Sequence, residues 1–274
     1  MQKFNYHCHT CFMDIFDGNN TADEMISAYE DKGFIEVGIS NHCIYNPTIG
    51  KMPPMHKQNF YDLDKLIDIY KRSFEWIDEA AFKHKISVKK GLEVDFFPSK
   101  EWRISFEKIL KELKPDYLIG STQFIRSENE DFMCGIYYLR NLPALSQDEM
   151  DELVINYWKN IVLSIESGYF SFIAHPDYCR KFNLSNTPKW NDLKYNVIDA
   201  LYKNKIACEV NTGGIRSEGN PYPDWWIVKE MINKEIPLLI SDDAHRITDT
   251  ASNFEIVENK LKEFNCKKRF SFNK

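Results

Sequence analysis

The sequence predicts an α/β fold in which a parallel sheet is closed, or nearly closed, by surrounding helices. Seven short apolar runs alternate with amphipathic segments along the 274 residues. The apolar runs are almost continuous, as in parallel strands that are covered on both faces. No break in composition marks a second domain, so we expect one domain over residues 1–274.

The first part of the chain supplies four of the predicted strands and four helices. The strands are expected at 4–10, 35–42, 86–96 and 117–124, and the helices at 21–32, 60–83, 102–113 and 147–167. Thr21 and Glu24 have the spacing of a capping box, and Gly33 follows as a helix stop. The second helix has apolar residues at helical spacing.

The remaining strands are expected at 170–175, 206–211 and 237–243, and the remaining helices at 192–203, 224–233 and 252–264. The glycine-containing stretch around 213–219 is expected to be a loop. The longest irregular stretch is 126–146, which is rich in aromatic residues. Long loops in compact domains are often lids or binding loops, and we predict a lid-like segment here.

Composition excludes several classes of protein. The net charge of −6 and the pI near 5.7 argue against a nucleic-acid surface that works by bulk charge. No apolar run is typical of a signal peptide or long enough to span a membrane. The seven cysteines are scattered, and Cys8 and Cys11 form a lone CxxC pair that we interpret as incidental. This usage fits reduced thiols, and a cytoplasmic protein is predicted.

Polar residues that suit metal binding recur where the predicted strands end. Five of the seven histidines lie there, and in an α/β barrel this rim carries the active site. His7 and His9 are two residues apart on one strand, so their side chains share a face. Each residue alone has a structural explanation, but as a group they predict a multi-metal site. The full set is His7, His9, His42, Glu93, Gln123, His175, Asp243 and His245. His56 and His84 are interpreted as ordinary surface or packing residues.

The same residues lie in motifs that resemble those of the polymerase-and-histidinol-phosphatase (PHP) superfamily. The motifs are HCHT (7–10), SNH (40–42), GLE (91–93), AHPD (174–177) and SDDAH (241–245), in the order of the family. The segment EVNTGGIR (209–216), followed by PYP (221–223), resembles the histidinol-phosphate phosphatase branch. The resemblance extends over most of the chain, from residue 7 to residue 246.

The resemblance implies a distorted (β/α)7 barrel, similar to a TIM barrel, with two or three divalent metal ions (Zn, Mn or Fe) at its rim. It implies one ion held by His7, His9, Glu93 and Asp243. A second ion would share Glu93 and use His175. In the family a histidine usually stands where this chain has Gln123, which is a weaker ligand. A third ion would use His42 and His245, with Asp14 as the best match for the remaining ligand and Asp17 as the alternative.

The activity implied by the resemblance is hydrolysis of a small phosphate monoester, with L-histidinol phosphate as the leading substrate in histidine biosynthesis. The implied catalytic residues are Glu93, Asp243 and His245. Arg216 and Arg180 are the implied phosphate-binding residues, and Lys181 beside Arg180 is a solvated charge or a further candidate. Guanidinium groups match phosphate oxygens bidentately.

Three alternatives remain open from the sequence. One is a related phosphoesterase that acts on another small phosphate ester. Another is a metal- or phosphate-binding protein whose catalysis is weakened by Gln123. A nuclease is disfavoured by the acidic pI, and neither a nucleic-acid nor a membrane partner is expected. The sequence gives no prediction of oligomeric state.

Overall fold

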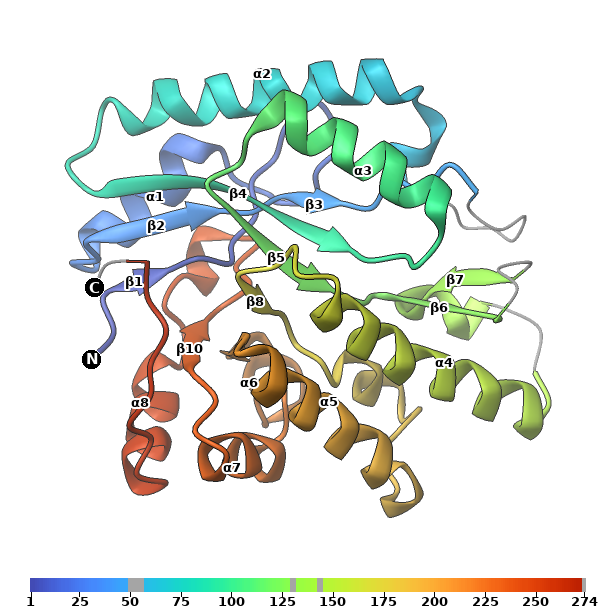
Figure 1. Cartoon of the computed structure of the whole chain (residues 1–274). Helices are drawn as coiled ribbons and strands as arrows, with labels where there is room; N and C mark the ends of the chain where they lie inside the picture. The colour runs from blue at the N-terminus through green and yellow to red at the C-terminus, as the bar shows by residue number, and fades with distance from the viewer. Residues whose placement is uncertain (49–56, 129–131, 142–144, 273–274) are drawn as a thin grey trace.

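A parallel sheet that is nearly closed into a barrel organises the molecule (Figure 1). The structure is a computed structural model that describes residues 1–48, 57–128, 132–141 and 145–272. Within these residues the strand order is β1 (Phe4–Asn5), β2 (Glu36–Ile39), β4 (Ser87–Asp95), β5 (Tyr117–Ser121), β8 (Phe172–Ile173), β9 (Ala207–Asn211) and β10 (Leu238–Ser241). Every neighbouring pair in this order is parallel. The predicted (β/α)7 barrel class is confirmed.

The second predicted strand is split in the structure. After β2 the chain breaks its ladder and resumes as β3 (His42–Cys43), which also pairs with β4. The register of this second pairing sets His42 beside Glu93. Two candidate ligands that are 51 positions apart in sequence are thereby brought side by side.

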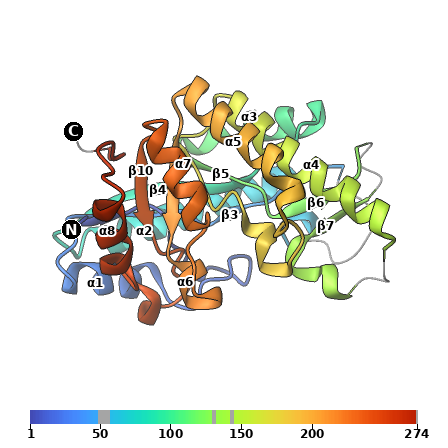
Figure 2. The same ribbon diagram turned by 90° about the horizontal axis from the view of Figure 1, so that it is seen from below.

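The helices occupy the predicted positions and surround the sheet. They are α1 (Ala22–Asp31), α2 (Leu63–Ala81), α3 (Lys100–Leu113), α4 (Gln147–Glu166), α5 (Asn191–Asn204), α7 (Trp225–Asn233) and α8 (Phe254–Glu263). Thr21 and Glu24 form the predicted capping box of α1. In Figure 1, α2 and α3 lie above the sheet, and α4, α5, α7 and α8 lie below it. Seen from below, α8, α7, α5 and α4 follow one another from left to right (Figure 2).

The short elements depart most from the sequence-based expectations. The predicted glycine-containing loop begins with a helix, α6 (Gly213–Glu218). An antiparallel pair forms where the predicted irregular segment begins, between β6 (Phe124–Arg126) and β7 (Met133–Gly135), and its apolar side chains are buried. The 3₁₀ helices are η1 (Lys57–Phe60), η2 (Ile136–Asn141), η3 (Tyr178–Phe182), η4 (Pro188–Trp190) and η5 (Ile247–Asp249). Residues 129–131 and 142–144 of the predicted lid lie outside the described residues.

The barrel is completed between β1 and β10 by a few contacts. At the rim, the N–H of His9 donates to the carbonyl of Ala244 (2.9 Å), and the N–H of Asp243 donates to the carbonyl of His7 (3.0 Å). Nearer the opposite end, the side chain of Gln2 exchanges two hydrogen bonds with the backbone of Ile240. We call this junction the seam.

The end of the barrel opposite the rim is filled by aromatic rings. Phe272 packs on Tyr6 and Tyr117, with ring centroids 4.8 and 5.3 Å apart. The tail that carries it is held by backbone hydrogen bonds between Leu238 and residues 268 and 270. Accordingly, both ends of the chain lie on the same side of the molecule (Figures 1 and 2).

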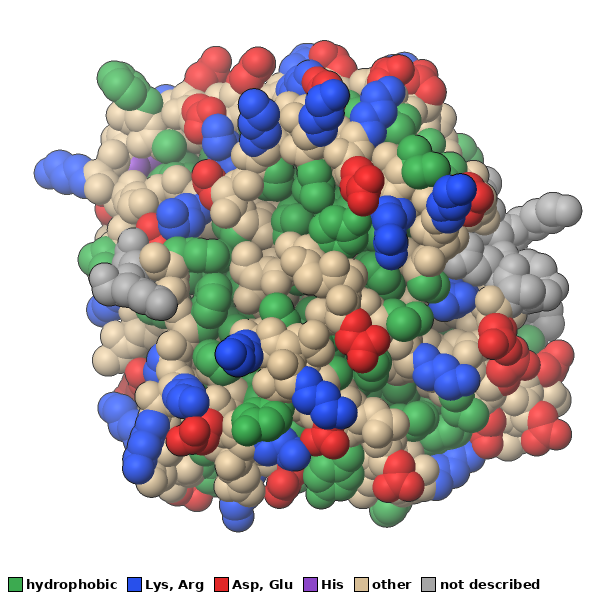
Figure 3. Space-filling model, viewed as in Figure 1, with side chains coloured by type: hydrophobic (Ala, Val, Ile, Leu, Met, Phe, Trp, Pro, Cys, Tyr) green, Lys and Arg blue, Asp and Glu red, His purple; other side chains and the backbone are tan. Residues whose placement is uncertain are grey.

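The molecular surface mixes charges of both signs. On the face drawn in Figure 3, basic and acidic side chains are interspersed with hydrophobic ones. This distribution agrees with the modest net charge of −6. Among the described residues, no helix combines the length and the apolar character needed to cross a bilayer.

Candidate metal centre

Four side chains of the first predicted metal set converge at the rim. His7 and His9 follow β1, Glu93 lies in β4, and Asp243 follows β10. Nε2 of His7 lies 3.4 Å from Oε2 of Glu93 and 3.4 Å from Oδ1 of Asp243. Nε2 of His9 lies 3.6 Å and 3.0 Å from the same two oxygens.

Three of these four spacings, at 3.4–3.6 Å, fit a shared ion better than direct hydrogen bonds. In a tetrahedral zinc site with bonds of about 2.0–2.1 Å, neighbouring donor atoms lie about 3.4 Å apart. Hydrogen bonds between nitrogen and oxygen are shorter, at about 2.7–3.2 Å. Nε2 of His7 and Nε2 of His9 are buried and make no hydrogen bond to the described part of the chain, and Oε2 of Glu93 lies 2.8 Å from Nδ1 of His42. Since buried polar atoms need partners, this donor set fits a divalent cation.

Glu209, on β9, is a fifth member of the cluster that the sequence alone did not assign. Its Oε2 lies 2.8 Å from Nδ1 of His7, and both side chains are fully buried. Its oxygens also accept hydrogen bonds from the N–H of His175, Nδ2 of Asn211 and Oγ of Ser241. With both oxygens engaged, Glu209 fits the role of orienting His7 rather than that of a ligand. The signal in the sequence was a lone carboxylate in an otherwise apolar strand.

Charges in the cluster shift the pKa values of its members strongly. Burial lowers the pKa of His7, but the carboxylates of Glu209, Asp243 and Glu93 outweigh it and raise this pKa well above its ordinary value. Burial raises the pKa of Glu93, but the neighbouring histidines hold it well below its usual range. Burial and the neighbouring imidazoles lower the pKa of His9 to about 4. The carboxylates are therefore anionic and call for positive charge at this point.

Gln123 and His175 meet at the other oxygen of Glu93. Nε2 of His175 lies 2.9 Å from Oε1 of Glu93, and Nε2 of Gln123 donates to the same atom at 2.8 Å. The backbone N–H of Gln123 is held by Asp95 at 2.6 Å. The structure thus places Gln123 beside the shared carboxylate as predicted. In this arrangement the Gln123 amide presents an N–H, rather than its carbonyl oxygen, to Glu93, and its role as a metal ligand stays a prediction.

Asp17, and not Asp14, lies with the histidines of the third predicted set. Oδ2 of Asp17 is 3.4 Å from Nε2 of His42 and 3.2 Å from Nε2 of His245. His9, Asp17, His42 and His245 each offer a donor atom, and these atoms lie within 4.8 Å of one another. The prediction of Asp14 as the ligand is corrected accordingly: Asp14 is exposed and belongs to none of the donor groups among the described residues.

Contacts on both sides of Asp17 explain this difference. A Cβ on Gly18 would lie only 2.5 Å from the carbonyl carbon of Thr10, so the chain there is pressed against the strand end. The N–H of Asn19 donates to the carbonyl of His245 at 2.8 Å. These contacts hold Asp17 at the rim, whereas Asp14 lies on the preceding turn with a φ of 55°.

Two candidate ligands have backbone conformations that are unusual for residues with a Cβ. His175 has a φ of 23° and Asp243 a φ of 51°, each just beyond the end of its strand. Such conformations cost about 1–3 kcal/mol and gather at functional sites. That both His175 and Asp243, at the rim, have such backbone conformations supports a functional role for these two residues.

Arg216 is the predicted phosphate-binding residue that the structure brings to the centre. It lies in α6, and its Nη2 donates to the carbonyls of Asp242 (2.7 Å) and Asp243 (3.4 Å). Within the described residues, its Nε and Nη1 have no protein acceptor. Arg216 therefore offers donors for an anion directly beside the candidate ligand Asp243.

Arg180 is the other predicted phosphate-binding residue, and it contacts several protein groups. Its guanidinium lies 4.8 Å from the ring centroid of Tyr222 and donates to the carbonyl of Pro221 at 2.8 Å. Carboxylates of Asp177 and Asp224 each lie 3.4 Å from its nitrogens. This cation is already neutralised by the protein. Lys181 lies over the ring of Tyr178, 5.6 Å from its centroid.

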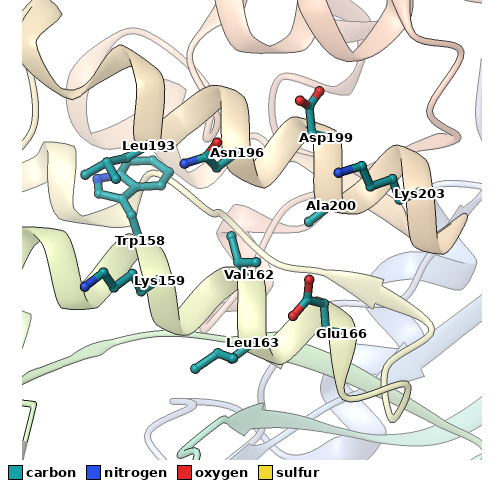
Figure 4. Close-up of a pocket in the computed structure, with 10 residues that line it drawn as sticks. All are labelled: Trp158, Lys159, Val162, Leu163, Glu166, Leu193, Asn196, Asp199, Ala200 and Lys203. Carbon is teal, nitrogen blue, oxygen red and sulfur yellow. The ribbon is translucent and has the colours of Figure 1, made fainter.

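A groove on the helical side of the molecule lacks the donor chemistry of the centre. A groove of about 410 Å³ runs between α4 and α5, where Trp158, Val162 and Leu193 form apolar walls and charged side chains border them (Figure 4). Neither histidine nor cysteine lines it. His84 pairs with carboxylates of α1, at 2.9 Å from Glu30, and its side chain is mostly buried, in agreement with the packing role that was one of its two interpretations. His56 lies outside the described residues.

Comparison with known proteins identifies similar chains. A "Probable histidinol-phosphatase" of Thermotoga maritima is 26% identical over 261 residues, which cover 94% of this chain and 91% of that protein. A "Histidinol-phosphatase" of Bacillus subtilis is 23% identical over 269 residues, covering 93% and 98%. The histidinol phosphate phosphatase (HISK) of Lactococcus lactis, solved with zinc, L-histidinol and phosphate, has a TM-score of 0.69 at 15% identity, covering 98% of this chain and 95% of that one.

The family comparison agrees with the motifs. The PHP domain matches residues 5–213, which is well over half of the chain. The matched region contains His7, His9, His42, Glu93 and His175, and the structural likeness supports the same barrel fold. The protein belongs to the PHP domain family.

Proposed function

We propose that this protein is a divalent-metal-dependent hydrolase that converts L-histidinol phosphate to L-histidinol and phosphate, a step of histidine biosynthesis. One observation carries the proposal: the donor atoms of His7, His9, Glu93 and Asp243 converge at 3.0–3.6 Å, with Arg216 directly beside them. The names of the two relatives that align over most of this chain support the choice of substrate.

We assign the rim residues to the metal ions as follows. His7, His9, Glu93 and Asp243 would hold one ion, and Glu93 with His175 would contribute to a second. His42, His245 and Asp17 would hold a third. Bound divalent ions supply positive charge that neutralises a phosphate ester and makes water more acidic. Their number and identity (Zn, Mn or Fe) belong to the proposal, since nitrogen and oxygen donors suit all three.

The remaining residues of the site have positioning and binding roles. Arg216 would bind phosphate oxygens through Nε and Nη1, while Nη2 stays anchored to the backbone beside Asp243. Glu209 would keep the proton of His7 on Nδ1, so that the Nε2 lone pair faces the metal. Among the predicted catalytic residues, Glu93, Asp243 and His245 would act as ligands, and we assign none of them as a general acid.

A substrate screen together with elemental analysis tests this function. Purified protein, loaded with Zn²⁺ or Mn²⁺, is assayed for phosphate release from L-histidinol phosphate and from a panel of sugar and nucleotide phosphates. We expect L-histidinol phosphate to have the highest kcat/KM. Much faster turnover of another ester would refute the substrate, and no turnover of any ester would refute the reaction class.

Arg216→Ala supplies the matching test of the phosphate site. We expect its KM to rise and inhibition by inorganic phosphate to weaken, because two donors to the phosphate are lost. Arg103→Ala, at an exposed position on α3, is the control and should behave like the native protein. We also propose that the protein works in the cytoplasm, since all seven cysteines are free thiols.

A further inference from the structure

A cavity of about 380 Å³ opens directly beside the metal centre. Three residues of the centre, Asp17, His42 and Gln123, contribute to its wall. An ester whose phosphate binds at the centre would therefore extend its alcohol part into this cavity. Its volume suits a small molecule, because such sites have volumes of about 300–1,000 Å³.

Part of the cavity wall is aromatic. Tyr137 and Tyr138 line it from η2, with ring centroids 5.4 Å apart and ring planes nearly perpendicular. Both rings are accessible, with 46% and 37% of their surface exposed. Tyr178 continues this wall to the centre, since its ring lies 5.3 Å from that of His175. Aromatic faces bind flat heteroaromatic rings and cations.

Asp14 lines the same cavity, as does Lys57, and it belongs to none of the donor groups found among the described residues. Its backbone carbonyl, rather than its carboxylate, accepts a hydrogen bond from Nζ of Lys57 at 2.8 Å. Within the described part of the chain, the Asp14 carboxylate has neither a hydrogen bond nor an ion pair. An exposed anion that lines a cavity is complementary to a cationic group on a ligand.

Building on the function proposed above, we propose that this cavity is the leaving-group pocket and that Asp14 is a specificity-determining residue. The carboxylate of Asp14 pairs with the primary ammonium of L-histidinol, and Tyr137 and Tyr138 pack against its imidazole. The pocket thus selects phosphate esters whose alcohol carries both a flat ring and an amine. This assignment gives Asp14 a role in substrate binding in place of the predicted role in metal binding.

Calorimetric titration of the metal-loaded protein tests the role of Asp14. The two ligands are L-histidinol and imidazolylpropanol, the analogue that lacks the amine. We expect Asp14→Asn to weaken binding of L-histidinol about threefold to tenfold, and to leave binding of the analogue within about twofold of the native value. Asp68→Asn, at an exposed position on α2, is the control and should change neither. Equal losses for both ligands, or no loss for L-histidinol, would overturn the assignment.

A second variant tests the aromatic wall. Tyr137→Ala should weaken binding of both ligands, because both carry the imidazole. Tyr195→Ala removes a ring of similar exposure (41%) from α5 and serves as the control, so its affinities should equal those of the native protein. If both ligands bind Tyr137→Ala as tightly as the native protein, the Tyr137 ring does not contribute to ligand binding.

These binding measurements are separable from the test of the hydrolase. If L-histidinol phosphate is not hydrolysed while Asp14→Asn still weakens L-histidinol binding selectively, the hydrolase function fails and the pocket stands. If the ester is hydrolysed while Asp14→Asn binds L-histidinol as the native protein does, the pocket assignment alone fails. The absence of measurable L-histidinol binding to the native metal-loaded protein also overturns the pocket.

Discussion

Nδ1 of His7 and Oε2 of Glu209 lie 2.8 Å apart in a contact from which solvent is fully excluded. A carboxylate at this position accepts a hydrogen bond from the Nδ1–H group. The proton is thereby kept on Nδ1, and the Nε2 lone pair is left free to bind a metal. We propose that Glu209, which lies in another part of the barrel, orients His7 rather than binding an ion itself. The residue that would fix the tautomer of His7 is therefore Glu209, on strand β9.

We predict that Glu209→Gln lowers metal affinity roughly 10–100-fold. The glutamine can direct its N–H₂ group at Nδ1, which favours the His7 tautomer whose Nε2 carries the proton. Isothermal titration with Zn²⁺ measures the affinity. Glu36→Gln is the control, because Glu36 is equally buried but accepts its hydrogen bond from Tyr6. Unchanged affinity in Glu209→Gln would refute the orienting role.

Asp17→Asn should lose one metal equivalent, and Asp14→Asn should retain the native stoichiometry. The reason is that Asp17 lies 3.2–3.4 Å from Nε2 of both His42 and His245, whereas Asp14 is outside the donor groups. Elemental analysis after dialysis gives the metal content of both variants. Loss of an equivalent in Asp14→Asn alone would restore the original sequence-based assignment.

Gln123→His should raise metal retention at the position shared by Glu93 and His175. The amide now donates an N–H to Glu93, and an imidazole would add a strong nitrogen ligand at the same place. Metal content after graded exposure to a chelator measures the change. The variant also tests the binding-only alternative, which predicts phosphatase activity in Gln123→His but none in the native protein. Ester hydrolysis by the native metal-loaded protein would eliminate that alternative.

Phe272→Ala should destabilise the fold by roughly 1–3 kcal/mol while metal affinity is retained. The half-buried ring packs on Tyr6 and Tyr117 at the end of the barrel remote from the rim. Denaturant unfolding measures the loss of stability. Phe82→Ala, at a position 93% exposed, is the control and should change stability little. A Phe272→Ala protein that unfolds at the native denaturant concentration would show that the tail ring does not stabilise the barrel.

The sequence was sufficient to predict the alternating strands and helices and the rim at the carboxyl ends of the strands. Apolar runs bounded by helix signals located all seven main strands. Because parallel strands end on one side, the residues after these runs had to converge there. This is why His7, Glu93 and Asp243 could be grouped although they are scattered along the chain. The pairing of β6 with β7 was missed because its apolar residues lie within a mixed, turn-rich segment.

Side-chain direction in the loops could not be predicted in the same way. Asp14 and Asp17 are equally polar and lie in the same loop, five and eight positions after His9. The choice between them depends on the contact of Gly18 with Thr10 and on a hydrogen bond from Asn19 to a distant loop. The contacts of Arg180 could not be predicted for a related reason, since some of its acceptors come from the distant segment around Pro221. Such contacts join segments that are far apart in the sequence, so they depend on the tertiary structure.

The seam between β1 and β10 has a consequence for how the protein acquires its metal. His7 and His9 stand on one side of the seam and Asp243 on the other, separated by most of the chain. An ion bound to all three would link the two sides of the seam. A nascent chain cannot form this site before β10 and Asp243 have been synthesised. Metal loading would therefore follow synthesis and folding. The ion found in the finished protein would then depend on which metals the surrounding compartment offers to an already formed site.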